Sequence, residues 1–319
     1  MRAQLDGRLQ RVQSLVDQIV ALEPDFATFC ELYKNGDDMV MKKLVAALKE
    51  RGLTYYAETG FGKGGGGARG LLSKYPIEET ELINSWMFKG VCNVDGKRIA
   101  IYPSHSNYVY YSCYYPRGYN DGGGNSGWEK LPDGPNTDVS EILERNALSG
   151  RPESAREFVE NAKKELDKGA IVILAGDLNE PSHLDWVEST KDMFEHNGCI
   201  VPWQTSLLLT ESGFIDAFRQ MYPDPATHPG LTWPVNNKGI PVSDLAWAAE
   251  ADERDRIDYI YYYPDSRFSL VDIKMVGATG TIVRGERVAA DTQEPIIDQA
   301  GEHWPSDHRG LLMTIRWNE

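Results

Sequence analysis

Hydrophobic residues recur at steps of three and four over residues 5–22, which predicts an amphipathic helix near the start of the chain. A second helix is expected over about 38–51, because apolar residues again share one face and Gly52 follows at the position of a C-cap. Between these helices, residues 26–30 form an apolar run. That run predicts a buried strand that ends at Glu31.

Short apolar runs dominate the rest of the chain, and one further helix is expected over about 153–168. The run at 170–175 is continuously apolar, which is typical of a strand buried on both faces. Strands and helices alternate early and strands cluster late, which favours one α/β domain over residues 1–319. The other expected strands are 53–57, 70–72, 98–102, 256–263, 268–275 and 311–317.

Two segments lack any periodicity. Residues 106–139 are rich in Tyr, Gly, Pro and Asn, and we expect a long loop that covers a functional site. The glycine-rich residues 60–67 contain Lys63 but no Gly-Lys-Ser/Thr, so they predict a flexible hairpin tip rather than a phosphate-binding P-loop. Five tyrosines in the long loop could stack on a base, hold a lipid headgroup or pack internally: Tyr108, Tyr110, Tyr111, Tyr114 and Tyr115.

Composition narrows the partners. The chain has 33 Lys and Arg against 48 Asp and Glu, a net charge of −15, which disfavours a generic nucleic-acid binder but leaves a local basic cleft open. No stretch is apolar enough to predict a membrane span. The four cysteines have no CxxC spacing, so a zinc knuckle is not expected. Cys30 is predicted to be a small buried residue, and one disulfide among Cys92, Cys113 and Cys199 stays possible.

Polar residues follow the strand at 170–175. Asp177 and Asn179 lie two positions apart, so in extended geometry both side chains point to one side of a cleft. There a carboxylate can orient or deprotonate a water, and an amide can donate to a phosphate oxygen. The alternative is an ordinary Asx turn, which Gly-Asp-x-Asn also favours.

A second set of polar residues lies near the C-terminus. Ser306-Asp307-His308 immediately precedes the last predicted strand, which places His308 at a strand end, where it can stabilise charge on a phosphate. The alternative is a solvated turn with an incidental histidine, which the Asp-His pair alone would favour. Asp258 lies on a strand whose period of two puts Arg256 and Ile260 on the same face. Its expected partner is a histidine, which it would hold in one tautomer; a salt bridge to Arg256 is the alternative.

Two more acidic or histidine side chains are candidates for the same site. Glu31 closes a hydrophobic strand and could supply one of the few carboxylates that Mg²⁺ needs. His105 follows the strand at 98–102 in Pro-Ser-His-Ser and could contact phosphate, although a surface-loop histidine is the alternative.

Read in order, Cys30-Glu31, Ala175–Asn179, Arg256–Tyr259 and Trp304–His308 resemble the endonuclease/exonuclease/phosphatase superfamily. Its members include deoxyribonucleases, abasic-site nucleases, sphingomyelinases and inositol polyphosphate phosphatases. The continuation Glu180–His183 is similar to bacterial members. The resemblance implies a four-layer α/β/β/α fold, in which two β-sheets form a sandwich flanked by helices.

The resemblance also implies roles for the candidate residues. Glu31, helped by Asp307, would hold Mg²⁺ or Mn²⁺, and Asp177 would orient or activate the water. Asn179, His105 and His308 would hold the phosphate oxygens. Asp258 would orient His308. Loss of His308 is expected to cut turnover by about two to four orders of magnitude.

One part of the family pattern is missing. The superfamily begins with a strand that carries an Asn near the metal, whereas here a helix starts at about residue 5, so that strand is expected to be absent or to lie upstream. An upstream segment could also carry a signal peptide, and a secreted or periplasmic location stays open.

The resemblance leaves several functions open. The expected activity is a phosphodiesterase or phosphatase on a small phosphorylated molecule or a phospholipid headgroup. A deoxyribonuclease-like endonuclease is the alternative, with nucleic acid as a less favoured partner. A non-catalytic binding protein on the same fold is the alternative from another class. The oligomeric state is not predicted.

Overall fold

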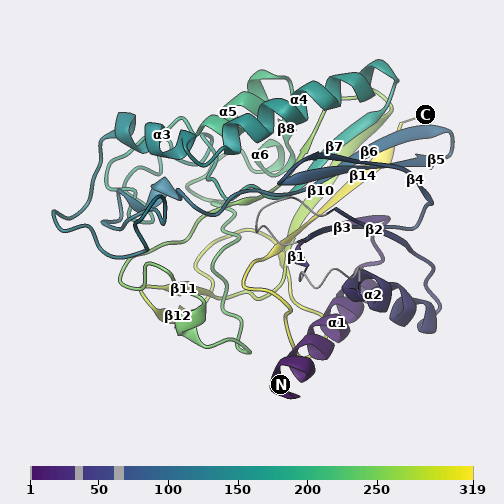
Figure 1. Cartoon of the computed structure of the whole chain (residues 1–319), viewed down its shortest axis with the longest axis horizontal. Coiled ribbons are helices and arrows are strands. Elements are labelled where there is room, and N and C mark those ends of the chain that lie inside the picture. Colours follow the sequence, from purple (N-terminus) through teal and green to yellow (C-terminus); the bar gives the residue numbers. More distant parts are fainter. Residues whose placement is uncertain (1, 33–38, 61–67, 319) are drawn as a thin grey trace.

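A computed structural model describes residues 2–32, 39–60 and 68–318. Its largest sheet has six strands in the order β4-β5-β6-β7-β9-β8 (Figure 1). Within it β6 and β7 are parallel, and the other neighbouring strands are antiparallel. The strands are β4 (Ile77–Asn84), β5 (Met87–Val94), β6 (Lys97–His105), β7 (Ile171–Asp177), β8 (Ile215–Asp216) and β9 (Asp258–Tyr262).

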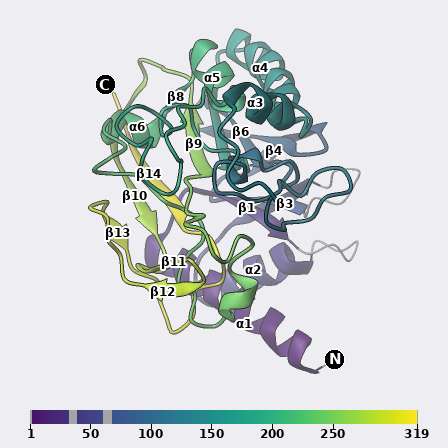
Figure 2. The ribbon, with the colours of Figure 1, turned by 90° about the vertical axis from the view of Figure 1, so that its left-hand side faces the viewer.

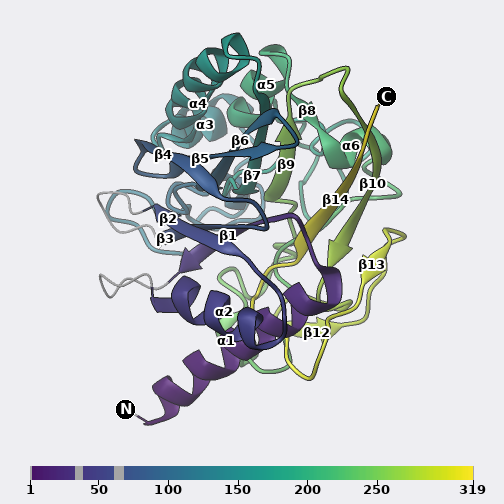
Figure 3. The same ribbon diagram turned by 90° about the vertical axis from the view of Figure 1, so that its right-hand side faces the viewer.

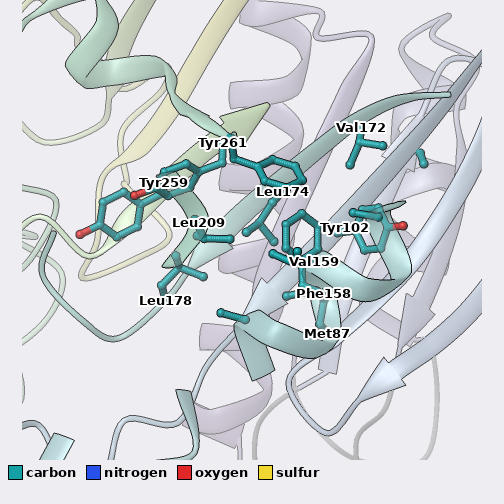
Figure 4. Close-up of a cluster of buried hydrophobic side chains, with 14 of the residues drawn as sticks. Met87, Tyr102, Phe158, Val159, Val172, Leu174, Leu178, Leu209, Tyr259 and Tyr261 are labelled. Carbon is teal, nitrogen blue, oxygen red and sulfur yellow. The ribbon is translucent and has the colours of Figure 1, made fainter. Parts of the chain in front are cut away.

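The centre of this sheet is apolar because β7 is a nearly continuous run of aliphatic residues and the middle of β6, residues 99–102, is apolar and buried. Helices α4 (Arg151–Asp167) and α5 (Gln204–Glu211) cover one face, and α3 (Val139–Ala147) lies beyond the end of α4, against the segment of Ser112–Tyr114 (Figure 1). Figure 4 shows the core between them, where Phe158 from α4 packs edge-on against Tyr102 from β6. This core fixes the ends of β6, β7 and β9, from which the candidate site is built.

The other face of the six-stranded sheet meets a second layer of strands. One sheet has the order β1-β3-β2, and α1 (Arg2–Leu22) and α2 (Met39–Glu50) lie on its outer side. The other has the order β13-β10-β14 (Figure 3). Their strands are β1 (Phe26–Leu32), β2 (Tyr56–Gly60), β3 (Ala68–Ser73), β10 (Phe268–Val276), β13 (Ile296–Ile297) and β14 (Gly310–Trp317).

The remaining elements are short. β11 (Thr281–Val283) and β12 (Glu286–Val288) form a two-stranded ribbon on the side of the molecule away from α4 (Figure 2). Helix α6 (Ala217–Met221) packs against β9 and β10. Two 3₁₀ turns cover Ser112–Tyr114 and Val242–Asp244.

The mixed α/β class expected from the sequence is confirmed, with several sheets and flanking helices. The sequence predicted that one sheet would form the second layer. In the described part of the chain, that layer consists instead of two separate three-stranded sheets. The predicted glycine-rich hairpin tip falls on 61–67, outside the described residues; β2 and β3 on either side pair antiparallel. No helix among the described residues is long and apolar enough to cross a membrane.

The cysteines are all free thiols, so the disulfide considered among Cys92, Cys113 and Cys199 does not form in this structure. Cys30 is only half-buried, and its thiol donates a hydrogen bond to the Ser104 carbonyl at 3.2 Å. This bond ties the end of β1 to the end of β6, which brings the second layer of strands to the candidate site.

Candidate active site

Strand register brings three of the predicted residues side by side at one edge of the six-stranded sheet. His105, the last residue of β6, lies opposite Asp177, the last residue of β7. Asp177 in turn lies opposite Asp258, the first residue of β9. Residues separated by more than seventy positions in the sequence are therefore neighbours at a single sheet edge.

Asp258 and His308 form a direct side-chain pair in the site. The Nδ1 atom of His308 lies 2.9 Å from Oδ2 of Asp258. This is the partner that the sequence predicts for Asp258. The alternative salt bridge to Arg256 is wrong, because that guanidinium is buried and pairs with Asp185 and Asp216 instead.

The predicted side-chain pattern around Arg256 is also wrong. Its guanidinium lies 4.6 Å above the ring of Tyr259, which points to the opposite face of β9 from Asp258. The cause is that β9 begins only at Asp258, so the alternation of side chains does not extend back to Arg256. Arg256 is therefore a core residue and does not reach the site.

His105 is buried at the end of β6, so the alternative of a surface-loop histidine is wrong. Its Nε2 atom lies 3.6 Å from Oε1 of Glu31 and 3.7 Å from Oδ2 of Asp177. Both distances exceed those of a direct hydrogen bond, so His105 faces the two carboxylates without binding either tightly. The Nδ1 atom of His105 is buried and makes no hydrogen bond.

Glu31 reaches His105 from the second layer of strands. It lies where the pairing of β1 with β3 shifts register, and its φ of 53° places it in the left-handed region. The irregularity turns the Glu31 side chain out of the sheet, and 72% of that side chain is exposed. Glu31 is thus an accessible carboxylate at the rim of an otherwise buried site.

Asp177 and Asn179 form a tight turn at the end of β7. The Asn179 backbone N–H donates to Oδ1 of Asp177 at 2.7 Å, and Asn179 has a φ of 49°. The Asx turn is therefore present, and the extended geometry expected beyond Asp177 is wrong. The Asn179 side chain donates one hydrogen bond to the Ser106 carbonyl at 2.9 Å, which leaves its second amide hydrogen for another acceptor.

Close packing of β7 against β6 makes glycine necessary at position 176. Gly176 has a φ of 147°, and a Cβ placed there would lie 2.0 Å from the Ser104 carbonyl oxygen. No side chain can be accommodated against fixed backbone at that distance. The glycine therefore lets Asp177 and His105 approach each other at the sheet edge.

The electrostatics of the site differ from one group to the next. Burial raises the pKa of Asp177 well above its ordinary value, and the negative charge of Asp258 adds to this rise. Burial alone would lower the pKa of His308, but the adjacent Asp258 carboxylate raises it well above its ordinary value. Burial and the nearby His308 cation lower the pKa of His105 to about 4. At neutral pH, His308 is therefore the cationic imidazole and His105 the neutral one.

The donor set suits a hard cation that keeps most of its waters. Among the described residues, no group of three His, Cys, Asp or Glu side chains surrounds one point as a complete protein-made metal site would. Mg²⁺ commonly binds one or two carboxylates and retains several waters. The carboxylates fit such an ion, because a cation would offset both the burial and the repulsion by Asp258 that raise the pKa of Asp177. Asp307 lines the same groove as Glu31, Asp177 and His308.

Two residues outside the predicted site hold its segments, Asn237 at the His308 segment and Thr232 at Asp258. Asn237 is buried, and its side-chain amide donates to the carbonyls of Trp304 at 2.9 Å and Ser306 at 2.8 Å. The hydroxyl of Thr232 accepts from the backbone N–H of Asp258 at 3.2 Å. Residues 232–237 therefore connect the Asp258 strand to the His308 segment. The sequence carries a weak signal for this in Thr232-Trp233-Pro234 and none for Asn237.

The long segment 106–139 has the expected irregular course up to the start of α3, and its tyrosines mostly pack internally. Tyr111, Tyr114 and Tyr115 are buried, and Tyr111 and Tyr114 donate hydrogen bonds to Asp255 and Glu253. Tyr108 is 52% exposed. Internal packing is therefore the role of most of these tyrosines.

Comparison with known proteins agrees with this geometry. The profile of the "Endonuclease/Exonuclease/phosphatase family" matches residues 2–308. A 92-residue stretch is 40% identical to an uncharacterized protein of Caenorhabditis elegans, F14F9.5, which covers 28% of this chain and 27% of that protein. The chain therefore matches only about a quarter of the length of that curated relative.

Solved structures share the fold. A humanized form of D. rerio TDP2 has 15% identity and a TM-score of 0.50, with 98% of this chain and 93% of that chain covered. An endonuclease/exonuclease/phosphatase family protein from Leptotrichia buccalis has 12% identity and a TM-score of 0.50, with 97% and 94% covered. The human Nocturnin catalytic domain with bound sulfate has 13% identity and a TM-score of 0.50, with 97% and 86% covered.

Proposed function

This chain belongs to the endonuclease/exonuclease/phosphatase family. From this premise we propose that it is a phosphoester hydrolase that cleaves a small phosphorylated molecule or a phospholipid headgroup with the help of Mg²⁺ or Mn²⁺. The observation that carries the proposal is the convergence of Glu31, His105, Asp177 and the Asp258–His308 pair at one edge of the fold. These residues come from separate segments of the chain. An acid-rich cluster with one cationic imidazole is suited to a metal-assisted reaction on an anionic ester.

Glu31, with Asp307, would hold the cation at the accessible rim of the site. When bound, the ion supplies Lewis-acid polarisation of the phosphate and offsets negative charge on the leaving group. It would also restore Asp177 to the carboxylate form that its burial disfavours. Glu31 is assigned to the cation because its side chain is exposed, and Asp177 is assigned to the attacking water because it is buried.

Asp177 orients the attacking water and accepts its proton. The Asx turn fixes Oδ1 of Asp177 through the Asn179 backbone N–H, which leaves Oδ2, on the side of His105, for this task. His308 is held as the imidazolium by Asp258 through Nδ1, so its Nε2 atom donates to a phosphate oxygen and stabilises the charge that develops there. The second amide hydrogen of Asn179 and the neutral His105 complete the phosphate contacts.

Charge favours a small or lipid-linked phosphoester over a polynucleotide. The net charge of −15 repels an extended polyanion. Among the described residues that line the groove, the cationic side chains are Lys43, Arg309 and His308. Arg309 is buried, and its guanidinium donates hydrogen bonds to backbone carbonyls, including those of Ala278 and Leu231. This part of the chain therefore offers no row of cations to follow a phosphate backbone.

The test is hydrolysis of bis-p-nitrophenyl phosphate and p-nitrophenyl phosphate with Mg²⁺, with Mn²⁺ and with EDTA. We expect EDTA-sensitive turnover, and His308→Ala should lower it by about two to four orders of magnitude. His303→Ala is the matched control, because that exposed imidazole faces Glu302 and not the site. Unchanged turnover in His308→Ala would contradict the assigned role. Cleavage of duplex DNA with a steep salt dependence would instead indicate a nuclease.

A further inference from the structure

A buried arginine connects the loop that follows β6 to the helices on the outside of the sheet. Arg151 is the first residue of α4, and its guanidinium donates to three backbone carbonyls of that loop and to two side chains. The acceptors are the carbonyls of Asn107 (2.7 Å), Val109 (3.1 Å) and Tyr110 (2.8 Å), Oδ1 of Asn146 (2.5 Å) and Oε2 of Glu180 (3.3 Å). These five bonds match the five N–H donors of a guanidinium, so every donor of Arg151 is used.

Glu180 is the negatively charged member of this cluster and directly follows Asn179 in the chain. Its Oε1 atom accepts from the backbone N–H of Thr205 at 2.7 Å. Its Oε2 atom accepts from the Thr205 hydroxyl and from the Asn146 side chain, both at 2.9 Å, in addition to Arg151. Because these partners lie on α3, α4 and α5, three helices fix the residue that comes after Asn179.

The loop that Arg151 holds starts at the catalytic turn, residues 177–179. The Ser106 backbone N–H donates to the Asp177 carbonyl at 2.9 Å, and the Ser106 carbonyl accepts from the Asn179 side chain at 2.9 Å. The next residue along the chain supplies the first of the three carbonyls that Arg151 binds. One path of bonds therefore leads from Asn179 through Ser106 to Arg151. A second path returns from Arg151 through Glu180 to the backbone of Asn179.

The conformation of Asn179 has to be held by its surroundings. Its φ of 49° lies in the left-handed region, which is unfavourable for a residue with a side chain and persists where neighbouring contacts enforce it. The two amide hydrogens of its side chain share one plane, so the bond to the Ser106 carbonyl also determines where the second hydrogen points. A shift of Ser106 would therefore turn that second hydrogen away from its acceptor.

We propose that Arg151 and Glu180 are positioning residues of the phosphoester reaction, which hold Ser106 and the catalytic turn so that the Asn179 amide points at a phosphate oxygen. Both side chains are only 1% exposed, so they act through Asn179 and do not touch the substrate themselves. The effect on turnover rests on the proposed hydrolase function. The effect on the turn does not, and it is tested without any substrate.

The same helix carries a second buried ion pair that serves as a control. Glu165 lies near the end of α4, is as buried as Glu180, and pairs with the buried Lys89 at 2.8 Å. Its backbone carbonyl accepts from the residue that precedes β7, whereas Asp177 ends that strand. At about 3.3 Å per residue, the two ends of β7 are about 20 Å apart. The Glu165 pair therefore attaches α4 to the sheet far from the catalytic turn.

The effect on the turn is tested by hydrogen exchange of single amides, followed by NMR in Arg151→Lys and Glu165→Gln. Lysine keeps the charge but concentrates three donors at one point, so it cannot bind the loop carbonyls and Glu180 together. The backbone amides of Ser106 and Asn179 should exchange at least about tenfold faster in Arg151→Lys and at the wild-type rate in Glu165→Gln. Unchanged exchange in Arg151→Lys, or equal acceleration in both variants, would overturn the proposal.

The effect on the reaction is tested with bis-p-nitrophenyl phosphate and Mn²⁺. Arg151→Lys should lower kcat about 10- to 100-fold, because a misplacement of about 1 Å at the reacting centre can cost about 10²-fold. KM should change less than about threefold, since the Asn179 contact is expected to strengthen as charge develops on the phosphate. Glu165→Gln should keep the wild-type kcat. A wild-type kcat in Arg151→Lys would overturn the proposal.

A double-mutant cycle tests whether Arg151 acts through Asn179. Asn179→Ala removes the amide, so adding Arg151→Lys to that variant should lower kcat by no more than about threefold further. A loss as large as in the wild-type background would overturn the proposal.

Two provisions keep the test decisive. If Arg151→Lys does not fold, Glu180→Gln replaces it in the exchange experiment and in the cycle, because its amide N–H would meet the donors that converge on the carboxylate. Absence of turnover in the wild type would count against the hydrolase function. The exchange of the Ser106 and Asn179 amides would then decide the positioning role by itself.

Discussion

Asp258→Asn isolates what the Asp258–His308 contact contributes to catalysis. The substitution keeps the shape of the side chain and removes its negative charge. The contact has a length of 2.9 Å, and the two side chains are 17% and 23% exposed. The pair is therefore sheltered enough from solvent for the charge to matter, and the exchange of oxygen for an amide should not disturb β9.

The expected loss follows from the strength of a charge-assisted hydrogen bond. Such bonds contribute about 1.5–3 kcal/mol, roughly twice as much as neutral ones. Since 1.4 kcal/mol corresponds to a factor of ten, turnover should fall by about 10- to 150-fold if the bond acts only in the transition state. Because His308 itself remains, the loss should be smaller than in His308→Ala.

The pH profile gives a second readout that a structural defect would not reproduce. Asp258 raises the pKa of His308, so wild-type His308 stays protonated into the alkaline range. Removal of the charge lowers that pKa, and the alkaline limb of kcat should move to lower pH in Asp258→Asn. The same contact stabilises the folded protein fully below about pH 6.5, the pKa of an unfolded histidine, and this stabilisation is lost as pH rises through the raised pKa of His308. The variant should therefore show a flatter dependence of folding stability on pH above about 6.5.

The assay is bis-p-nitrophenyl phosphate hydrolysis with Mn²⁺ between acidic and alkaline pH, accompanied by urea unfolding. Asp265→Asn is the matched control, because Asp265 is 19% exposed, pairs with Arg267 and lies far from the site in the turn before β10. The control should keep wild-type turnover and the wild-type alkaline limb. An Asp258→Asn enzyme with an unshifted alkaline limb and undiminished kcat would refute the role given to this pair.

Two further substitutions test other parts of the site. Asp177→Asn should raise the thermal midpoint of the cation-free protein at pH 7, because burial raises the pKa of Asp177 and makes its charged form unfavourable. The turnover of this variant should fall below detection. A thermal midpoint in EDTA that equals that of the wild type would contradict this account. Asn237→Ala should cost about 3 kcal/mol of folding stability, from three side-chain hydrogen bonds of about 1 kcal/mol each, and should lower kcat about tenfold because the His308 segment loses its anchor. Wild-type kcat after a measured loss of stability would show that Asn237 only supports the fold.

Local sequence patterns predicted most of the elements that carry the site. The helix expected over 5–22 is observed as α1, Arg2–Leu22. The strand expected over 98–102 is observed as the longer β6, Lys97–His105. The strand expected at 53–57 is observed instead at Tyr56–Gly60. The reason is local, since the Leu53 backbone N–H bonds to Leu48 at the end of α2 and its side chain joins the core beneath that helix.

Elements without a clear apolar period were missed. β4 is an edge strand whose middle residues are exposed, so its alternation of apolar and polar residues is weak. Helix α3 begins inside the segment expected to be a loop, although Asp138 caps it by accepting from the backbone N–H groups of Ser140 and Glu141. An N-cap aspartate was the available signal there. One domain over residues 1–319 stays a prediction.

The polar residues of the site were easier to find than the contacts between them. Asp177 ends β7, Asp258 begins β9 and His308 lies just before β14, and strand ends can be predicted from the sequence. Their alignment depends on the register of β6, β7 and β9, which no local pattern specifies. Asn237 lies in an irregular segment and bonds to residues 67 and 69 positions away, so sequence pattern alone offered no reason to single it out.

The site joins two layers of the fold, so its geometry depends on how these layers pack against each other. His105, Asp177 and Asp258 belong to the six-stranded sheet, whereas Glu31 lies next to the end of β1 and His308 lies two residues before β14. The 3.6 Å separation of Glu31 from His105 and the 2.9 Å contact of Asp258 with His308 are therefore distances between layers. Those distances depend on how β1 and β14 pack against the six-stranded sheet. A change in this packing should consequently alter the positions of the metal-binding carboxylate and of the phosphate-binding imidazolium together, without any contact with either group.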